Sequence, residues 1–306
     1  MAAQGVHRSM SVAIAIGTFD GVHLGHRHLF ARLGATATAL GARTALITFE
    51  PFPRAVLAPA FAPRLLLNAE RRIELLSALA SVVDVYPFTA ETAALSAEQF
   101  LGDIARRLDD RIVAIVGGPD IALGHKRHGN AQYLRTLGAR MDFRLDIVPE
   151  LRLDGTAVRS GVIRDLIAQG DVVEARRFLG RWPTIDGTVV HGDGRGRTIG
   201  VPTANIAIDG RRLLPARGVY AVRARADGIA ADAVSNIGTR PTVDGTVESI
   251  EVHILDFDGD LYDQKLEITL VSRLRDEIRF PSLQALAGQI ERDIVVARQR
   301  LAAAPK

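Results

Sequence analysis

The stretch Val12-Ala-Ile-Ala-Ile-Gly17-Thr-Phe-Asp-Gly21-Val-His-Leu-Gly25-His26 decides how the first half of this 306-residue chain folds. Its first five residues are apolar without alternation, as in a strand that is buried on both faces of a parallel sheet. The glycine-containing segment that follows is typical of a tight turn, and the two histidines lie where a helix would begin. The stretch therefore predicts a strand, a turn and a helix N-terminus, the place where open α/β sheets bind ligands.

Four more apolar runs follow this first strand at intervals of roughly 30 residues, the length of a βαβ unit. Between them Ser96-Ala-Glu-Gln99 has the pattern of a capping box, and apolar residues then recur on one helical face from Phe100 to Leu108. We expect an α/β domain with a doubly wound parallel sheet. The four runs are Thr44–Phe49, Val82–Tyr86, Ile112–Val116 and Phe143–Val148.

A change of pattern near Pro183 predicts a second domain. We assign residues 1–183 to the α/β domain and residues 184–306 to the domain that follows. Two short helices are expected to close the first domain, and their caps and ends are Ser160, Gly170, Asp171 and Gly180.

The second half has short runs of alternating polarity, such as Val219–Arg225 and Glu251–Asp256. Together with Asp-Gly turn pairs they indicate antiparallel sheet that closes into a barrel or a sandwich. A C-terminal amphipathic helix with Leu283, Leu286, Ile290 and Ile294 on one face is expected to pack against this sheet. The expected turn pairs are Asp186-Gly187, Asp227-Gly228, Asp244-Gly245 and Asp258-Gly259.

Composition excludes several functional classes. The 38 Lys and Arg against 35 Asp and Glu leave a net charge of only +3, and aromatic residues make up 5%, so neither nucleic acid nor a membrane surface is an expected partner. No run approaches the roughly 20 apolar residues of a membrane span, and the first ten residues lack a secretory signal core. Cys is absent, which excludes disulfides and thiolate chemistry. We expect a cytoplasmic protein of undetermined oligomeric state.

The first candidate site is the pair His23 and His26, which project from one face of the first helical turn. The helix N-terminus attracts phosphate, and Gly21 and Gly25 let a ligand approach the backbone closely. Two imidazoles at this place suit the triphosphate of a nucleotide and the charge on departing pyrophosphate. The alternative is that the two histidines lie there by chance, one of them as a cap or a metal ligand, although no third ligand lies at a usual spacing.

The second candidate site begins with a glycine-rich loop over residues 187–197, whose backbone amides can form an anion nest. Thr203 and Asn205 follow it and share one face of an extended segment, which suits Mg²⁺ that also holds phosphates. Glu251 begins a later strand, and a carboxylate can deprotonate an alcohol that attacks a γ-phosphate. Each of these pieces taken singly is also common in β proteins, as a turn or as a solvated strand face.

In their joint order these motifs resemble the bacterial bifunctional riboflavin kinase/FMN adenylyltransferase family over nearly the whole chain. The resemblance implies an HxGH nucleotidyltransferase-like domain followed by a riboflavin kinase barrel. It further implies ATP as co-substrate, Mg²⁺ as cofactor, and riboflavin and FMN as the other substrates. Further positions that match the family are Phe49–Arg54, Gly118–Gly124 with Arg127 and Gly129, Arg159–Arg164, Asn236–Thr242, Glu251–Phe257, Asp260–Tyr262, Arg275 and Phe280.

Site residues follow from these matches, position by position. The catalytic residues implied are Glu251, His23 and His26, and the metal ligands implied are Thr203 and Asn205. The flavin-binding residues implied are Phe52, Asn236 and Arg275. The nucleotide-binding residues implied are Gly17, Phe19, Asp20, Gly25, Asp120, Ser160, Arg164, Gly192, Gly196, Gly200, Thr203 and Asn205.

The signatures of the second half are nearly complete, whereas departures from the family pattern in the first half leave three functions open. The leading hypothesis is that the chain carries both activities. Its first rival is a kinase beside a decayed or altered adenylyltransferase, and its second is a protein that binds flavin without catalysis. Intact Thr203, Asn205 and Glu251 count against the last of these. The departures are Phe52 in place of His, Arg159 in place of Ser, Gly161 in place of Thr, and Ile121 and Leu123 in place of Phe.

Overall fold

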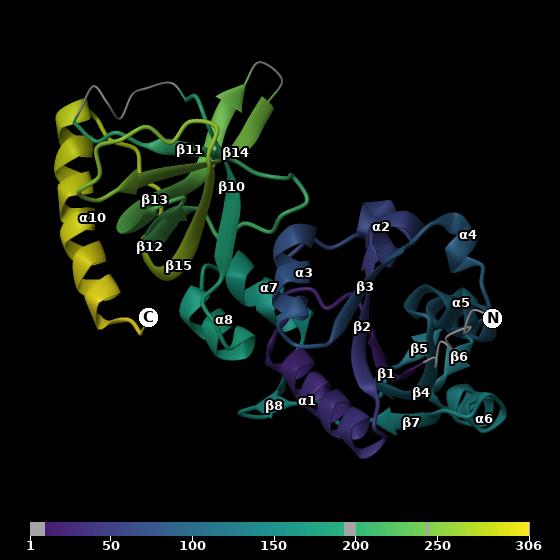
Figure 1. Ribbon diagram of the computed structural model, residues 1–306. Helices are drawn as coiled ribbons and strands as arrows, with labels where there is room; N and C mark the ends of the chain where they lie inside the picture. Colours follow the sequence, from purple (N-terminus) through teal and green to yellow (C-terminus); the bar gives the residue numbers. More distant parts are fainter. Residues whose placement is uncertain (1–9, 193–199, 243–244, 306) are drawn as a thin grey trace, which may run out of the picture. The chain divides into compact units, whose positions relative to one another are not determined.

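The computed structural model describes residues 10–192, 200–242 and 245–305, and it divides into two compact units. The first unit holds the described residues up to Pro63 together with Asn68–Arg159, and the second holds Arg64–Leu67 and the chain from Ser160 onward. Each unit is built around its own sheet (Figure 1).

Five parallel strands form the sheet of the first unit, in the order β3-β2-β1-β4-β7. All five were predicted, with ends that differ by a few residues at most, because each run is rich in apolar and β-branched residues. The doubly wound α/β prediction is thereby confirmed. The strands are β1 (Met10–Ile16), β2 (Arg43–Glu50), β3 (Val82–Pro87), β4 (Asp110–Gly117) and β7 (Arg144–Ile147).

Helices cover both faces of this sheet. Val12 and Ile14 share an apolar cluster with α5 and α6, whereas the alternate residues Ala13 and Ala15 are equally buried and point to the opposite face. Helix α1 packs against β1, β2 and β4. The predicted capping box of Ser96 and Gln99 is present at the start of α5. The helices are α1 (Leu24–Ala39), α2 (Pro53–Leu57), α3 (Ala69–Ser77), α4 (Ala90–Ala93), α5 (Ala97–Leu108) and α6 (Ala131–Met141).

Short elements complete the strand ends of the first unit. They are the 3₁₀ turns η1 (Pro59–Phe61) and η2 (His125–Arg127), the pair β5 (Ala122–Leu123) with β6 (Gly129–Asn130), and the pair β8 (Arg152–Leu153) with β9 (Thr156–Ala157).

Six antiparallel strands of the second unit form a closed barrel in the order β10-β11-β14-β13-β12-β15. Alternate residues fill its interior, among them Ile206, Val222, Ile250, Val252 and Ile268. The barrel prediction is confirmed. The strands are β10 (Thr184–Val190), β11 (Ala204–Ala207), β12 (Gly218–Ala226), β13 (Ile229–Thr242), β14 (Gly245–Ile254) and β15 (Lys265–Arg275).

Three helices accompany the barrel: α7 (Ser160–Ala168), α8 (Val172–Leu179) and α10 (Leu283–Ala303). Asp171 caps α8 and Gly180 ends it in the left-handed conformation, as predicted. Ile294, Ala297 and Leu301 of α10 pack on the outer face of the barrel. Leu283, by contrast, is 57% exposed, so its predicted place on the packed face was wrong: it lies in the first turn, before the helix reaches the barrel's apolar cluster.

One predicted turn is also wrong. Asp186-Gly187 lies inside β10 rather than between strands, because the Gly187 Cα sits so close to the Ala207 carbonyl of β11 that no Cβ fits. Asp227-Gly228 does join β12 to β13, with Gly228 at φ +70°. Asp258-Gly259 lies in the loop after β14, and Asp244 lies outside the described residues.

Candidate active sites

The chain turns sharply between β1 and α1, and this turn builds the first site. The N–H of Gly17 donates to the Ile47 carbonyl at 3.0 Å, which ties the end of β1 to β2. Phe19 and Val22 adopt left-handed backbone conformations at φ +49° and +41°, as does Gly21 at +83°. Non-glycine residues rarely adopt such angles, and they gather at functional sites where the surrounding structure enforces them.

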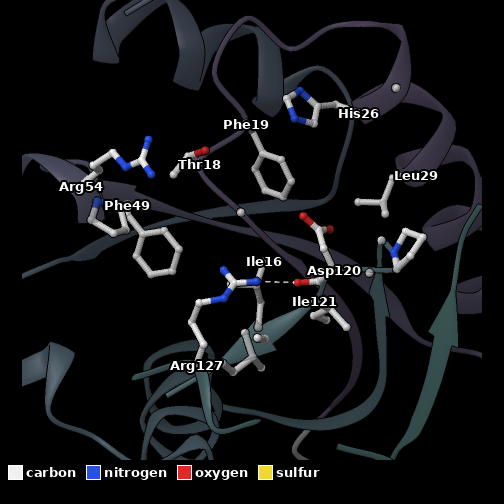
Figure 2. A pocket seen from close by; sticks show the side chains of 18 of the residues that line it. Ile16, Thr18, Phe19, His26, Leu29, Phe49, Arg54, Asp120, Ile121 and Arg127 are labelled. Atoms are coloured by element: carbon white, nitrogen blue, oxygen red, sulfur yellow. Dashed lines mark hydrogen bonds between the residues drawn. The ribbon is translucent and has the colours of Figure 1, made fainter. Parts of the chain in front are cut away.

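His23 and His26 stack on each other at the start of α1, with ring centroids 3.6 Å apart and planes 17° apart. His23 is 4% exposed and caps the helix, because its Nδ1 accepts the backbone N–H of His26 at 3.3 Å. A neutral His23 whose Nδ1 is an acceptor carries its proton on Nε2, so that atom is a donor. Phe19 meets the His26 ring edge-on at 5.4 Å (Figure 2).

Gly25 is required by this geometry. A Cβ at this position would lie 2.6 Å from the Val158 carbonyl oxygen and 3.1 Å from the His23 ring. Both distances are shorter than ordinary contacts, so any side chain here would push α1 away from the β9 end or displace the imidazole.

A cavity of about 730 Å³ opens in front of the histidine pair. Six of the predicted residues line it: Gly17, Phe19, His23, Gly25, His26 and Asp120. Figure 2 shows Asp120 and Arg127 beside the rings of Phe19 and Phe49, and Arg127 donates to the Asp120 carbonyl at 2.7 Å. A cavity of this size accommodates a drug-sized ligand.

Sequence reasoning missed part of the aromatic and cationic wall of this cavity. Aromatic side chains line one part, with Tyr86 and Phe100 in edge-to-face contact at 5.0 Å. The sequence predicts Tyr86 and Phe100 as core positions of a strand and a helix, because apolar periodicity does not separate a core from a pocket wall. The aromatic and cationic lining residues without a predicted site role are Tyr86, Phe88, Phe100 and Lys126, whereas Phe49, Arg54 and Arg127 belong to segments that match the family.

Two predicted residues of the first unit lie outside the cavity lining. Asp20 is 1% exposed beneath the turn, and Phe52 is 7% exposed. The guanidinium of Arg72 covers the Phe52 ring at 4.3 Å and donates to the Phe49 carbonyl at 3.0 Å. Burial lowers the pKa of Arg72, and the neighbouring Glu50 opposes that change.

Other departures from the family pattern are also accommodated. Arg159 donates through Nε to the Glu150 carboxylate at 2.6 Å. Gly161 has open space where a Cβ would stand. Gly161, Ser160 and Arg164 belong to the second unit, where Ser160 is the first residue of α7 and Arg164 donates to the Arg64 carbonyl at 2.9 Å.

The second site lies on the outer face of the barrel. Asn205 of β11 stands directly opposite Glu251 of β14, and Glu251 stands directly opposite Asn236 of β13. Residues paired in this way project from the same face with Cβ atoms about 4.5–5.5 Å apart. Ile250 and Val252 point into the barrel core, so Glu251 and both amides face outward. The register thus places a carboxylate between two amides.

The Gly192 Cα abuts the Asn205 amide so closely that a Cβ would collide with it. Gly200 has φ +76°, and the backbone from Thr203 then enters β11. His253, on the same face as Glu251, contacts the Pro202 carbonyl oxygen through Nδ1 at 2.8 Å. Gly196 lies outside the described residues.

Arg275, the third predicted flavin-binding residue, is the last residue of β15. Its guanidinium pairs with Asp293 of α10 at 2.8 Å and lies 5.8 Å from the Phe280 ring. Asp293 is 5% exposed and accepts from Gln289 as well. Asn236 donates to Glu277 at 3.4 Å.

The described residues contain no group of three His, Cys, Asp or Glu side chains that could hold a metal ion. Thr203 and Asn205 supply oxygen donors of the kind that hard divalent cations accept, and such sites take their remaining ligands from phosphates and water. No helix among these residues is both long and apolar enough to span a membrane.

Comparison with known proteins matches both halves of the chain. The FAD synthetase family matches residues 6–162, and the riboflavin kinase family matches residues 179–301. The chain is 38% identical to the bifunctional riboflavin kinase/FMN adenylyltransferase of Pseudomonas fluorescens, over 92% of this chain and 91% of that protein. The chain belongs to the bifunctional riboflavin kinase/FMN adenylyltransferase family.

Further relatives agree with this membership. The enzyme of the same description from Haemophilus influenzae is 36% identical over 96% of this chain and 97% of its own length. A crystal structure described as a macrolide-efflux protein from Streptococcus pneumoniae is 32% identical, with a TM-score of 0.84 over 95% of this chain and 94% of its own. The chain thus carries an FAD synthetase domain and a riboflavin kinase domain. These two activities use ATP, typically with a divalent metal ion.

The family matches leave residues 163–178, between the two domains, unassigned. The domain boundary near Pro183 therefore stays a prediction.

Proposed function

We propose that this chain phosphorylates riboflavin to FMN on the barrel and transfers AMP from ATP to FMN on the α/β unit, which yields FAD and pyrophosphate. The observation that carries the proposal is the stacked pair His23 and His26 at a helix start, facing a cavity of about 730 Å³. A pure kinase would have no use for this arrangement.

In the adenylyl transfer, a phosphate oxygen of FMN attacks the α-phosphorus of ATP, and the bond to the bridging oxygen of pyrophosphate breaks. The chain supplies positioning and charge stabilisation rather than a nucleophile. The Nε2–H of His23 and the ring of His26 are placed to donate to phosphate oxygens as negative charge moves to the leaving group. The N-terminus of α1 also stabilises this negative charge, through its free backbone N–H groups and the positive end of the helix dipole.

In the kinase reaction, the 5′-hydroxyl oxygen of riboflavin attacks the γ-phosphorus and ADP leaves. Glu251 accepts the hydroxyl proton, and the neighbouring Asn205 and Asn236 orient it without adding charge. Mg²⁺, when bound, neutralises the phosphate charge of ATP. Thr203 and Asn205 would hold it, because both offer neutral oxygens of the kind that hard divalent cations accept.

The flavin-binding roles of Asn236 and Arg275, and the nucleotide roles of Ser160 and Arg164, remain part of this proposal. We drop Phe52 as a flavin contact, because its ring is covered by Arg72 and it does not line the cavity. Consumption of ATP by both reactions is the reason for proposing a cytoplasmic location.

The chief rival is a kinase with an inactive adenylyltransferase unit, suggested by Phe52, Arg159 and Gly161. Against it, Phe52 is a packed residue, Arg159 is paired with Glu150, and Gly161 leaves space rather than obstructing it. Incubation of the chain with FMN, ATP and Mg²⁺, followed by chromatography, separates the two. FAD and pyrophosphate are expected, whereas FAD absent while riboflavin is still converted to FMN would leave the rival. Flavin binding without any ATP consumption would establish the non-catalytic alternative.

A further inference from the structure

The segment that leads into β11 is held in two different ways. Ala204 and Asn205 pair with Val252 and Glu251 of β14, and this ladder ends at Ala204. Continued by one residue, the same register would set Thr203 opposite His253. Beyond Ala204 the backbone pairing is replaced by a side-chain contact: Nδ1 of His253 lies 2.8 Å from the Pro202 carbonyl oxygen. Thr203 is therefore fixed between a backbone pair on one side and a side-chain hydrogen bond on the other.

The direction of this hydrogen bond is determined by its acceptor. A carbonyl oxygen has no proton to give, so Nδ1 of His253 must carry the hydrogen. His253 lies on the outer face of β14 together with Glu251, since Val252 and Ile254 fill the barrel core. The ring thus stands beside the proposed base but is directed toward the backbone of the segment that bears Thr203 and Asn205.

We infer that His253 is a positioning residue for the metal–nucleotide segment: its Nδ1–H fixes the Pro202 carbonyl and thereby the direction of the Thr203 hydroxyl relative to the Asn205 amide. This inference rests on the proposed function of Thr203 and Asn205. Sites that bind phosphates with a metal need such fixed donors, because small displacements of the donors weaken binding.

The test uses two amide variants, Asn and Gln, whose side-chain N–H groups lie at different distances from the backbone. In H253N the side-chain nitrogen takes the position of Nδ1 and keeps the donor. In H253Q it takes the position of Nε2 and loses the bond to Pro202. We expect H253Q to raise the KM for Mg·ATP in FMN formation roughly tenfold, the effect of one lost hydrogen bond, while H253N stays within about twofold of the parent. The KM for riboflavin should change little in either variant.

Hydrogen exchange of the peptide over residues 200–207, measured on the full chain with and without Mg·ADP, gives a readout that is independent of turnover. Protection by Mg·ADP is expected in the parent chain and in H253N but reduced in H253Q at the same nucleotide concentration. Equal protection and equal KM in all three would overturn the inference. A parent peptide that Mg·ADP does not protect would instead refute the metal–nucleotide role of this segment, and the inference with it. Thermal unfolding verifies each variant, and H253A replaces H253Q should the latter unfold.

Discussion

At the scale of single residues, Glu251 stands directly opposite Asn205 on one neighbouring strand and Asn236 on the other. Replacing Glu251 by Gln keeps its shape but deletes the proton acceptor. We expect FMN formation to fall by about 10²–10⁴-fold, the usual contribution of a general base, while riboflavin affinity changes little. Steady-state rates and flavin fluorescence titration measure the two quantities. Glu267→Gln, which removes another barrel carboxylate paired with Arg225, is the matched control and should keep the parental rate. A Glu251→Gln chain with normal turnover would remove this residue from the mechanism.

His26 gives the corresponding prediction for the other unit. His26→Ala removes one ring of the stacked pair, and we expect FAD formation to fall by roughly 10²–10³-fold, as when one donor to a developing charge is lost. FMN formation should be unaffected, since Glu251 belongs to the other unit. His28→Ala serves as control, because His28 is exposed and does not line the cavity. Loss of both activities together in His26→Ala would contradict the assignment of two sites.

At the scale of elements, helix α1 requires glycine at Gly25, near its start, but not at Gly34, in its middle. Gly25→Ala places a Cβ against the Val158 carbonyl and the His23 ring, so we expect about 1–3 kcal/mol of destabilisation together with a loss of FAD formation. Gly34→Ala in the same helix meets nothing within 4 Å and should stabilise by roughly 0.5–1 kcal/mol. Chemical unfolding of both variants measures the difference. Equal effects would show that the α1 start is not tightly packed.

The contact between β3 and α5 predicts a dependence of stability on pH. Tyr86 donates to Asp103 at 2.7 Å, and this hydrogen bond, followed by that from Arg106, holds the pKa of Asp103 below its ordinary value of 3.8. Burial is the main cause that raises the pKa of Tyr86. A carboxyl whose pKa is lowered on folding stabilises fully above its unfolded pKa, and that stabilisation is lost as pH falls through the folded pKa.

We therefore expect Asp103→Asn to lower the melting temperature of the chain at pH 7 and to reduce the loss of stability below about pH 4. Melting temperatures recorded from pH 7 to pH 3 measure both effects. A variant whose melting temperature falls in parallel with that of the parent chain over this whole range would show that Asp103 contributes nothing through its ionisation.

Sequence patterns predicted elements well where the deciding information is local. The ends of β3 were placed within one residue because its apolar run is bounded by turn residues. The register that aligns Asn205, Glu251 and Asn236 was beyond such reasoning, since pairing depends on segments far apart in the chain. Asp186-Gly187 shows the same limit: the dipeptide is a local turn signal, but its conformation is decided by the Ala207 carbonyl, twenty residues away. Phe52 was assigned as a flavin contact from its motif position alone. Its packing under the Arg72 guanidinium, which identifies it as a buried structural residue, could not be read from the sequence.

At the scale of the whole molecule, two units with separate cores carry successive chemistry in one chain. The product of the proposed kinase reaction is the acceptor in the proposed adenylyl transfer. In the presence of Mg²⁺, riboflavin and ATP should therefore be sufficient substrates for FAD, and the two phosphates of FAD should have different origins. The phosphate on the ribityl side comes from the γ-position of one ATP, and the other comes from the α-position of a second ATP.

The most direct measurement follows these two phosphates. The chain is incubated with riboflavin, Mg²⁺ and ATP labelled in parallel at the γ- or the α-phosphorus, and the flavins are separated by chromatography. We predict γ-label in both FMN and FAD, and α-label in FAD but never in FMN. FMN that carries γ-label while no flavin carries α-label would contradict the account of two active sites.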